Sequence, residues 1–169
     1  MSALRLVPLS AAVMRMLADG DLEGARKAAG VALTPYFVEH AWLWRMRLDQ
    51  AQEDPASLDW IARAALDGDV VVGHVGFHGP PDATGMVEVA YSVDPALRRR
   101  GYATAMLAAA LDWAAAEPTA SVVRASISPE NTASLATIAP FGFRQVGEQR
   151  DEEDGLELLF ERPAPGTDR

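Results

Sequence analysis

The sequence of 169 residues contains no cysteine, so disulfide bonds, zinc–thiolate sites and a cysteine nucleophile are all excluded. No apolar run approaches the roughly 18 to 20 residues that a membrane-spanning helix needs. The first residues also lack the charged, apolar and small-residue pattern of a signal peptide. We therefore expect a cytoplasmic protein that does not act on a membrane.

Positive charge is also scarce, because 15 Lys and Arg residues stand against 24 Asp and Glu residues, a net charge of -9. A surface with that balance repels a polyanion, which argues against a nucleic-acid-binding protein. Three consecutive arginines, Arg98 to Arg100, are a local exception to the acidic background.

The length and the 49% hydrophobic content predict one domain with a sizeable core. We place this domain over residues 1–162 and expect a disordered tail over residues 163–169. The sequence contains no internal repeat and no sign of a second domain.

The most informative stretch is a predicted strand, turn and helix between residues 87 and 117. Apolar and polar side chains alternate over residues 87–93, which indicates a strand. Pro95 ends the strand, and strong helix formers follow Gly101. The first N–H groups of a helix are unpaired and carry partial positive charge, so this junction predicts an anion-binding site that the arginines reinforce. The alternative is a solvated run of charges beside an ordinary turn glycine.

The motif Arg98-x-x-Gly101-x-Ala103 resembles the pyrophosphate loop of the GNAT N-acetyltransferases, which bind acetyl-coenzyme A (acetyl-CoA) between a splayed pair of strands. Flanking segments resemble the same family in order and spacing: Glu88-x-x-Tyr91-x-Val93-x-Pro95 before the loop, and Asn131-x-x-Ser134 and Gly142-Phe143 after it. The resemblance covers about residues 70–143. Within the family, the sequence is most similar to the branch that acetylates the N-terminal amines of ribosomal proteins.

The resemblance implies an α+β fold of α/β sandwich-like type. Its central sheet is mixed but mostly antiparallel, has six or seven strands flanked by helices, and is splayed between two central parallel strands. The local patterns agree with this fold. Asp67-Gly68 predicts a hairpin with a type I′ turn, and the crossover rule makes a strand over residues 122–127 parallel to the strand over residues 87–93.

The other elements follow from apolar spacing, caps and breaks. We expect further strands over residues 4–8, 60–66, 70–77, 143–148 and 156–161, and helices over residues 11–18, 21–29, 36–52, 103–117 and from 132. Aromatic residues of the helix at 36–52 either line an acceptor pocket or belong to the core. The acidic tip of the last hairpin, residues 150–155, either attracts a cationic acceptor or is a solvated loop.

The resemblance also implies that acetyl-CoA is the co-substrate and that no metal takes part. It assigns the pyrophosphate to the loop and helix start, and the pantetheine arm to the edge of the preceding strand. The residues implied in binding are Ser92, Val93, Arg98, Arg99, Arg100, Gly101, Tyr102, Ala103, Thr104, Asn131 and Ser134. For the last two, a helix cap and an ordinary helix position remain as alternatives.

Glu88 is the candidate general base. An amine with a pKa near ~10 is mostly protonated at neutral pH and must lose a proton, directly or through water, before it can attack a thioester. A carboxylate in the middle of an apolar strand is costly unless it is solvated or used. Glu88 in a salt bridge or in solvent is the alternative interpretation, and His74 and His78 on the preceding strand are alternative bases.

The general acid of the family pattern has no counterpart in this sequence. Many relatives carry a tyrosine seven residues after the asparagine, where this chain has Ile138. Tyr91, water or no protein group at all are the remaining possibilities for protonating the thiolate.

The sequence therefore predicts an enzyme that transfers the acetyl group of acetyl-CoA to a primary amine, either a peptide N-terminus or a small molecule. Without cysteine, we expect direct transfer in a ternary complex. The alternatives are a non-catalytic acyl-CoA-binding or sensor domain and a binder of nucleotide phosphates. The acceptor and the oligomeric state stay open, with a homodimer as an expectation from the family.

Overall fold

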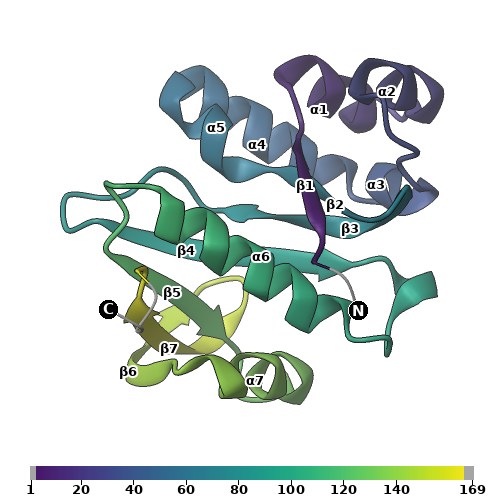
Figure 1. The fold of residues 1–169 in the computed structure, drawn as a ribbon. Coiled ribbons are helices and arrows are strands. Elements are labelled where there is room, and N and C mark those ends of the chain that lie inside the picture. Colours follow the sequence, from purple (N-terminus) through teal and green to yellow (C-terminus); the bar gives the residue numbers. More distant parts are fainter. Residues whose placement is uncertain (1–2, 166–169) are drawn as a thin grey trace.

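The computed structural model describes residues 3–165 and contains a seven-stranded open sheet with helices on both faces (Figure 1). The strands are β1 (Arg5–Pro8), β2 (Arg63–Asp67), β3 (Val70–Phe77), β4 (Met86–Val93), β5 (Val122–Ile127), β6 (Arg144–Asp151) and β7 (Gly155–Pro163). The helices are α1 (Ala11–Ala18), α2 (Leu22–Ala29), α3 (Pro35–Glu39), α4 (Ala41–Glu53), α5 (Leu58–Ile61), α6 (Tyr102–Ala116) and α7 (Thr132–Ile138), with 3-10 turns η1 (Pro55–Ser57), η2 (Pro95–Leu97) and η3 (Ala139–Phe141). None of the helices in residues 3–165 has the length and apolar character to cross a membrane.

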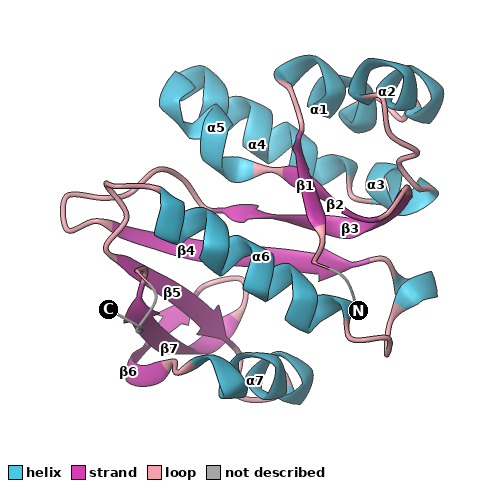
Figure 2. Ribbon diagram, viewed as in Figure 1, coloured by secondary structure: helices cyan, strands magenta, loops and turns pink. Residues whose placement is uncertain are grey.

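The strands follow the order β1-β2-β3-β4-β5-β7-β6 (Figure 2). Strands β4 and β5 are parallel, whereas every other neighbouring pair is antiparallel. Helix α6 makes the crossover between the two parallel strands, as the crossover rule requires. The predicted mixed, mostly antiparallel sheet is confirmed.

The two parallel strands stay paired over only three positions, which end at Glu88 and its partner Arg124. Beyond this point β4 remains bonded to β3 as far as Val93, and β5 remains bonded to β7 as far as Ile127. The strands therefore diverge after Glu88, and a gap opens between them (Figure 1). This is the splay that the family resemblance implies.

Each face of the sheet has its own core. On one face, α6 packs against the apolar sides of β3, β4 and β5, and the ring of Phe77 meets that of Trp113 edge to face at 4.7 Å. On the other face, helices α1 to α4 enclose a second cluster around Phe37 and Trp44, whose parallel rings lie 6.0 Å apart. The gap between β4 and β5 thus opens in a sheet that is packed on both sides.

The predicted helix over residues 36–52 is wrong in one respect, because the chain breaks it at His40 into α3 and α4. Side chains take the carbonyl groups that a continuous helix would use. The indole of Trp44 donates to the carbonyl of Phe37 at 2.6 Å, and Nδ1 of His40 lies 3.2 Å from the carbonyl of Tyr36. The break turns α3 toward the end of β4.

The predicted strand over residues 60–66 is wrong at its start. Residues 58–61 form α5, which follows η1 after the Asp54-Pro55 cap, and β2 begins only at Arg63. A short apolar run does not separate a buried helical turn from a strand by its pattern alone. Trp60 and Ile61 are buried from this helical turn instead.

The β2–β3 hairpin exists, but its loop is Gly68-Asp69, one residue later than predicted. Asp67 pairs with Val70, and only Gly68 in the loop has a positive φ, of 59°. A type I′ turn needs positive φ at both central residues, so that prediction is wrong, and a glycine in the first position is the pattern of type II′.

The ordered chain also continues beyond the predicted domain end at residue 162. Pro163 belongs to β7, and Ala164 is buried with its N–H bonded to the carbonyl of Ser121 at 2.9 Å. Residues 166–169 of the predicted tail lie outside the described residues.

The core around α6 predicts a large stability effect at Phe77, which is fully buried between the rings of Trp60 and Trp113. Replacing Phe77 by alanine should lower the free energy of unfolding by about 3–5 kcal/mol, because it removes apolar contacts and leaves a cavity. Val70→Ala on the same strand is the control, since Val70 is 54% exposed, and it should change stability by no more than about 0.5 kcal/mol. Urea denaturation measures both, and equal effects would contradict this assignment of the core.

Candidate active site

The predicted anion-binding loop lies at the end of β4 and leads through η2 into α6. Gly101 is the residue before the helix and has a φ of 84°, a left-handed conformation that glycine adopts without strain. Within residues 3–165, Arg99 is the one non-glycine residue with a positive φ, of 64°. Two left-handed residues in close succession turn consecutive N–H groups toward one side of the loop.

These N–H groups are open. Within the described chain, no acceptor takes a hydrogen bond from the backbone N–H groups of residues 99–104. The first helical bond of α6 runs from the N–H of Ala105 to the carbonyl of Gly101 at 3.1 Å, and no side chain caps the helix start. The free amides and the helix dipole together meet the physical requirements of a phosphate site.

A buried aspartate holds the loop in place. Asp94 accepts hydrogen bonds from the hydroxyl of Thr34 at 2.6 Å and from the N–H of Ala96 at 3.0 Å, while its own N–H donates to the carbonyl of Val72 at 2.8 Å. Thr34 precedes α3, so this bond ties that helix to the loop. The role of Asp94 was not predicted from the sequence, although an Asp directly before a proline is a common cap of a short helical turn.

The loop borders a cleft of about 650 Å³ between the end of β4, the start of α6 and α7. All of the predicted cofactor residues except Arg100 line this cleft. Its walls are Tyr91, Ser92, Val93, Arg98, Arg99, Gly101, Tyr102, Ala103, Thr104, Asn131, Ala133, Ser134 and Thr137.

Three of the predicted cofactor residues have side chains that are bonded elsewhere in the protein or lie outside the cleft. The hydroxyl of Tyr102 donates to Asp67 at 2.8 Å, so the side chain serves the β2–β3 hairpin and only its backbone N–H is free for a ligand. Asn131 caps α7 through the N–H of Ser134 at 3.1 Å, which is the alternative role that the sequence left open. Arg100 is exposed and lies outside the cleft.

Glu88 sits at the point where β4 and β5 part, and its side chain is only 17% exposed. Its Oε2 lies 3.0 Å from Nδ1 of His78, so two residues that the sequence offered as alternative bases form one pair. Desolvation lowers the pKa of His78, and the negative charge of Glu88 counteracts this. The pair opens on a cavity of about 260 Å³, on which Asp154 and Glu157 of the acidic hairpin also border.

A third cavity, of about 240 Å³, lies between α4, β3 and β4 and contains aromatic rings of the predicted helix at 36–52. His74 lines it, with its ring 5.1 Å from that of Trp44 and 6.1 Å from that of Tyr36. Burial lowers the pKa of His74 to about 4, and the nearby charges of His40 and Arg47 add to the effect. The imidazole is therefore neutral at pH 7 and is not the partner of Glu88.

Among residues 3–165, Tyr91 alone lines the cleft beside the loop, the cavity at Glu88 and the cavity between α4, β3 and β4. Burial raises the pKa of Tyr91, and the nearby hydroxyls of Ser134 and Thr137 act in the opposite direction. Ile138, which occupies the position of the family's tyrosine, is buried in the core. The three cavities thus meet at a phenol from β4 rather than at a side chain from α7.

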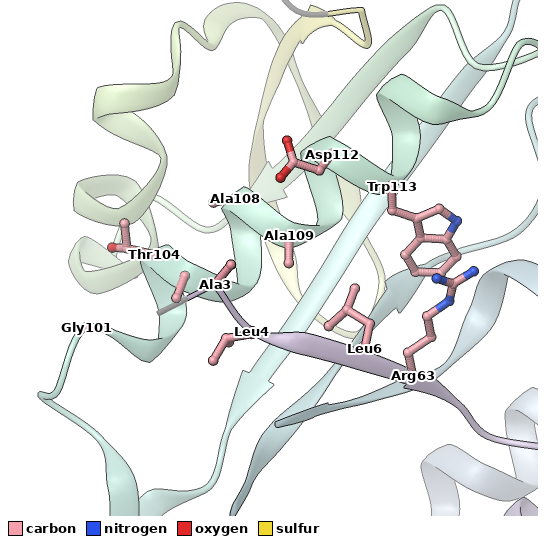
Figure 3. A pocket seen from close by; sticks show the side chains of 11 residues that line it. Ala3, Leu4, Leu6, Arg63, Gly101, Thr104, Ala108, Ala109, Asp112 and Trp113 are labelled. Atoms are coloured by element: carbon pink, nitrogen blue, oxygen red, sulfur yellow. The ribbon is translucent and has the colours of Figure 1, made fainter. Parts of the chain in front are cut away.

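A cavity of about 840 Å³, larger than these three, lies elsewhere, along β1 and the flank of α6 (Figure 3). Its walls are mainly alanine and leucine, and the guanidinium of Arg63 stacks on Trp113 at 3.6 Å. The Glu88–His78 pair does not line it. Of the residues with open N–H groups, it is lined by Gly101 and Thr104 but not by the others. Size alone therefore does not make it the active site, and we place the chemistry at the splay.

An open helix start beside a gap between two parallel strands suits a ligand that has a diphosphate and an extended arm. A family model described as an acetyltransferase (GNAT) domain matches residues 4–144. The chain belongs to this family, so the family prediction is confirmed.

Known relatives agree with this assignment. The chain is 33% identical over 73 residues to the uncharacterized N-acetyltransferase YjdG of Bacillus subtilis (strain 168), a match that covers 43% of this chain and 44% of that protein. Among solved structures, the fold is similar to a ribosomal-protein-S5-alanine acetyltransferase from Vibrio fischeri, with a TM-score of 0.65 at 15% identity over 97% of this chain and 94% of the other. It is also similar to Mycobacterium smegmatis RimJ in complex with CoA-disulfide, with a TM-score of 0.66 at 20% identity over 96% of this chain and 86% of the other. These structural matches establish the fold, and the sequence match spans under half of the B. subtilis protein.

The low pKa of His74 predicts a specific loss of stability in acid. Because the pKa of His74 is about 4 in the folded protein and 6.5 in a free histidine, the unfolded state binds more protons between these values. Above pH 6.5 the neutral His74 therefore makes its full contribution to the free energy of unfolding. That free energy should fall by up to ~3 kcal/mol as the pH drops to about 4.

His74→Phe removes this titration but keeps an aromatic ring. Urea denaturation at a series of pH values should give a curve for the variant that is flatter than that of the wild type across this window. Parallel curves would show that His74 is protonated equally in both states.

Proposed function

We propose that this protein transfers the acetyl group of acetyl-CoA to a primary amine by direct attack in a ternary complex. The observation that carries the proposal is the Glu88–His78 pair, which lies where β4 and β5 part and connects through Tyr91 to the open helix start. We also infer that residues 3–165 act as one catalytic domain, and the absence of cysteine favours a cytoplasmic location.

The cleft offers what a bound CoA diphosphate needs. The N–H groups of residues 99–104 would hold the diphosphate, and Arg98 and Arg99 would supply positive charge beside it. The edge of β4 from Val89 to Val93, which β5 leaves unpaired, would bind the amide groups of the pantetheine arm. When bound, acetyl-CoA supplies a thioester carbonyl as the electrophile.

Glu88 is the proposed base. The carboxylate takes a proton from the incoming ammonium, directly or through a water molecule, so that a neutral amine reaches the electrophile. In its neutral form, His78 donates from Nδ1 to Glu88 and orients the carboxylate toward the gap.

Tyr91 is the proposed partner of the departing sulfur. Its raised pKa keeps the phenol protonated at neutral pH, and Ser134 and Thr137 of α7 line the same cleft. A phenol of raised pKa gives up its proton reluctantly. Tyr91 therefore stabilises the thiolate by a hydrogen bond rather than by complete proton transfer.

Replacing Glu88 by glutamine tests the base. The variant should lose about 10²- to 10⁴-fold in kcat/KM at pH 7, the usual contribution of a positioned base, while its Kd for CoA stays within about twofold. A thiol-release assay with a panel of primary amines gives the first quantity and calorimetry the second. Glu148→Gln is the matched control, because Glu148 is exposed on β6 and lines none of the three cavities.

The same experiment separates an enzyme from a sensor. A wild-type protein that binds CoA and acetylates none of the amines would favour a non-catalytic acyl-CoA-binding domain. A Glu88→Gln variant with wild-type turnover would remove the carboxylate from the mechanism and leave the transferase assignment intact.

The arginines of the loop give a second test, because Arg98 lines the cleft and Arg100 does not. Arg98→Gln should weaken CoA binding by about 5- to 20-fold, the range between an exposed ion pair and a charge-assisted hydrogen bond. Arg100→Gln removes the same charge and should weaken it by less than about threefold, an effect that disappears at high salt. Calorimetry at two salt concentrations measures both, and equal losses would mean that only the general field of the loop attracts the cofactor.

A further inference from the structure

The cavity between α4, β3 and β4 contains a buried positive charge with no negative partner. Arg47 is only 9% exposed and lines this cavity of about 240 Å³, which we call the Arg47 cavity. Its Nη1 donates to Oε1 of Gln50 at 3.0 Å and makes a long contact of 3.4 Å with the carbonyl of His78. Both acceptors are neutral, and Arg47 forms no salt bridge with any of the residues 3–165.

A buried charge without a partner is rare, because desolvation disfavours it and proteins usually pair it. Burial lowers the pKa of Arg47, with no carboxylate to counteract the effect. A guanidinium remains protonated in any case. The simplest role for an unpaired, desolvated guanidinium at the wall of a cavity is to bind an anionic group of a ligand.

A second nitrogen atom at the same cavity also lacks a partner. Nε2 of His74 is buried and makes no hydrogen bond to a described residue. The ring lies close enough to Arg47 for the guanidinium charge to lower its pKa. Nε2 has no solvent-accessible surface, so Arg47 is the donor that the cavity offers to an anion, and His74 is a neutral neighbour.

The rest of the wall is apolar and the volume is small. Trp42, Leu43 and Ile61 line the cavity, and Trp42 is 61% exposed at the surface of α4. A volume of about 240 Å³ lies below the roughly 300–1,000 Å³ of pockets for drug-sized ligands. The cavity therefore fits one small molecule with an apolar part better than an oligosaccharide or a folded chain.

The position of His78 relates this cavity to the proposed base. Its carbonyl contacts Arg47, and its ring pairs with Glu88. The Arg47 cavity and the Glu88 cavity share Ala90 and Tyr91 as walls. An anion on Arg47 is thus held beside the gap into which Glu88 faces.

We propose that the acceptor is an α-amino acid with an apolar side chain, whose carboxylate binds Arg47 and whose amine faces Glu88. The inference rests on the proposed acetyl transfer and names its substrate class. The α-ammonium loses one proton to Glu88, and its lone pair attacks the thioester carbonyl. The N–C bond forms, the C–S bond breaks, and the second proton leaves the nitrogen for the departing thiolate, which gives an N-acetyl amino acid and CoA.

The experiment compares L-phenylalanine, L-leucine, L-methionine and L-tryptophan with their amides, which keep the amine and lose the negative charge. For at least one pair, wild-type kcat/KM should favour the amino acid over its amide by about tenfold or more, as a hydrogen bond to a charged group predicts. In Arg47→Gln the preference should collapse to within about twofold, and Arg47→Lys should restore part of it.

Arg45→Gln is the matched control. Arg45 is exposed on the same helix and donates to the carbonyl of Ala18 at 2.9 Å, outside the cavity. The variant should keep the wild-type preference. Thermal unfolding checks the fold of Arg47→Gln, in which relief of the desolvated charge offsets the loss of the hydrogen bond to Gln50.

Two outcomes overturn the inference while leaving acetyl transfer intact: amides acetylated as well as the amino acids, or a preference that survives in Arg47→Gln. If no amine releases thiol, the proposed function fails, and binding decides the inference separately. Calorimetry in the presence of CoA should then detect N-acetyl-L-phenylalanine or N-acetyl-L-leucine bound to the wild type and at least tenfold weaker binding to Arg47→Gln. The absence of such binding also overturns it.

Discussion

The loss of pairing between β4 and β5 after Glu88 is the constraint on which the rest of the structure depends. Each strand keeps its other neighbour, so divergence leaves backbone groups unpaired on the inner edges only. Arg124, at the last paired position, binds Glu161 of β7 with Nε 2.8 Å from the carboxylate, which draws β5 toward β7 where it leaves β4. Because the gap opens inside a packed sheet, its polar edges become available to a ligand without exposing either core.

The end of β4 is fastened from the acceptor side. Thr34 binds Asp94, and the hydroxyl of Tyr36 binds that of Ser92, so two side chains from the start of α3 hold the segment that leads into the phosphate loop. The break at His40 makes this possible, because a continuous helix from residue 35 to residue 53 would not let α3 and α4 take different directions. The walls of the acceptor side and the loop on the cofactor side are therefore parts of one hydrogen-bonded unit.

Sequence reasoning succeeded where the determinants are local. Alternation gave β4, and Gly101 with the helix formers after it located the loop. It failed where distant contacts decide. The break at His40 depends on an indole seven residues from the carbonyl it binds, and the partner of Asp94 lies 60 residues away. Arg47 was overlooked because a charged residue on a helix is normally exposed, although its place three residues after Trp44 puts it on the buried stripe.

Tyr91 borders the cofactor cleft and both cavities on the acceptor side. A substitution at this position therefore changes the walls of all three spaces at once. Attempts to broaden the range of amines by directed evolution have more room at Trp42, which borders only the Arg47 cavity. Substitutions on α4 can therefore change one cavity by itself, whereas the phenol on β4 separates all three spaces.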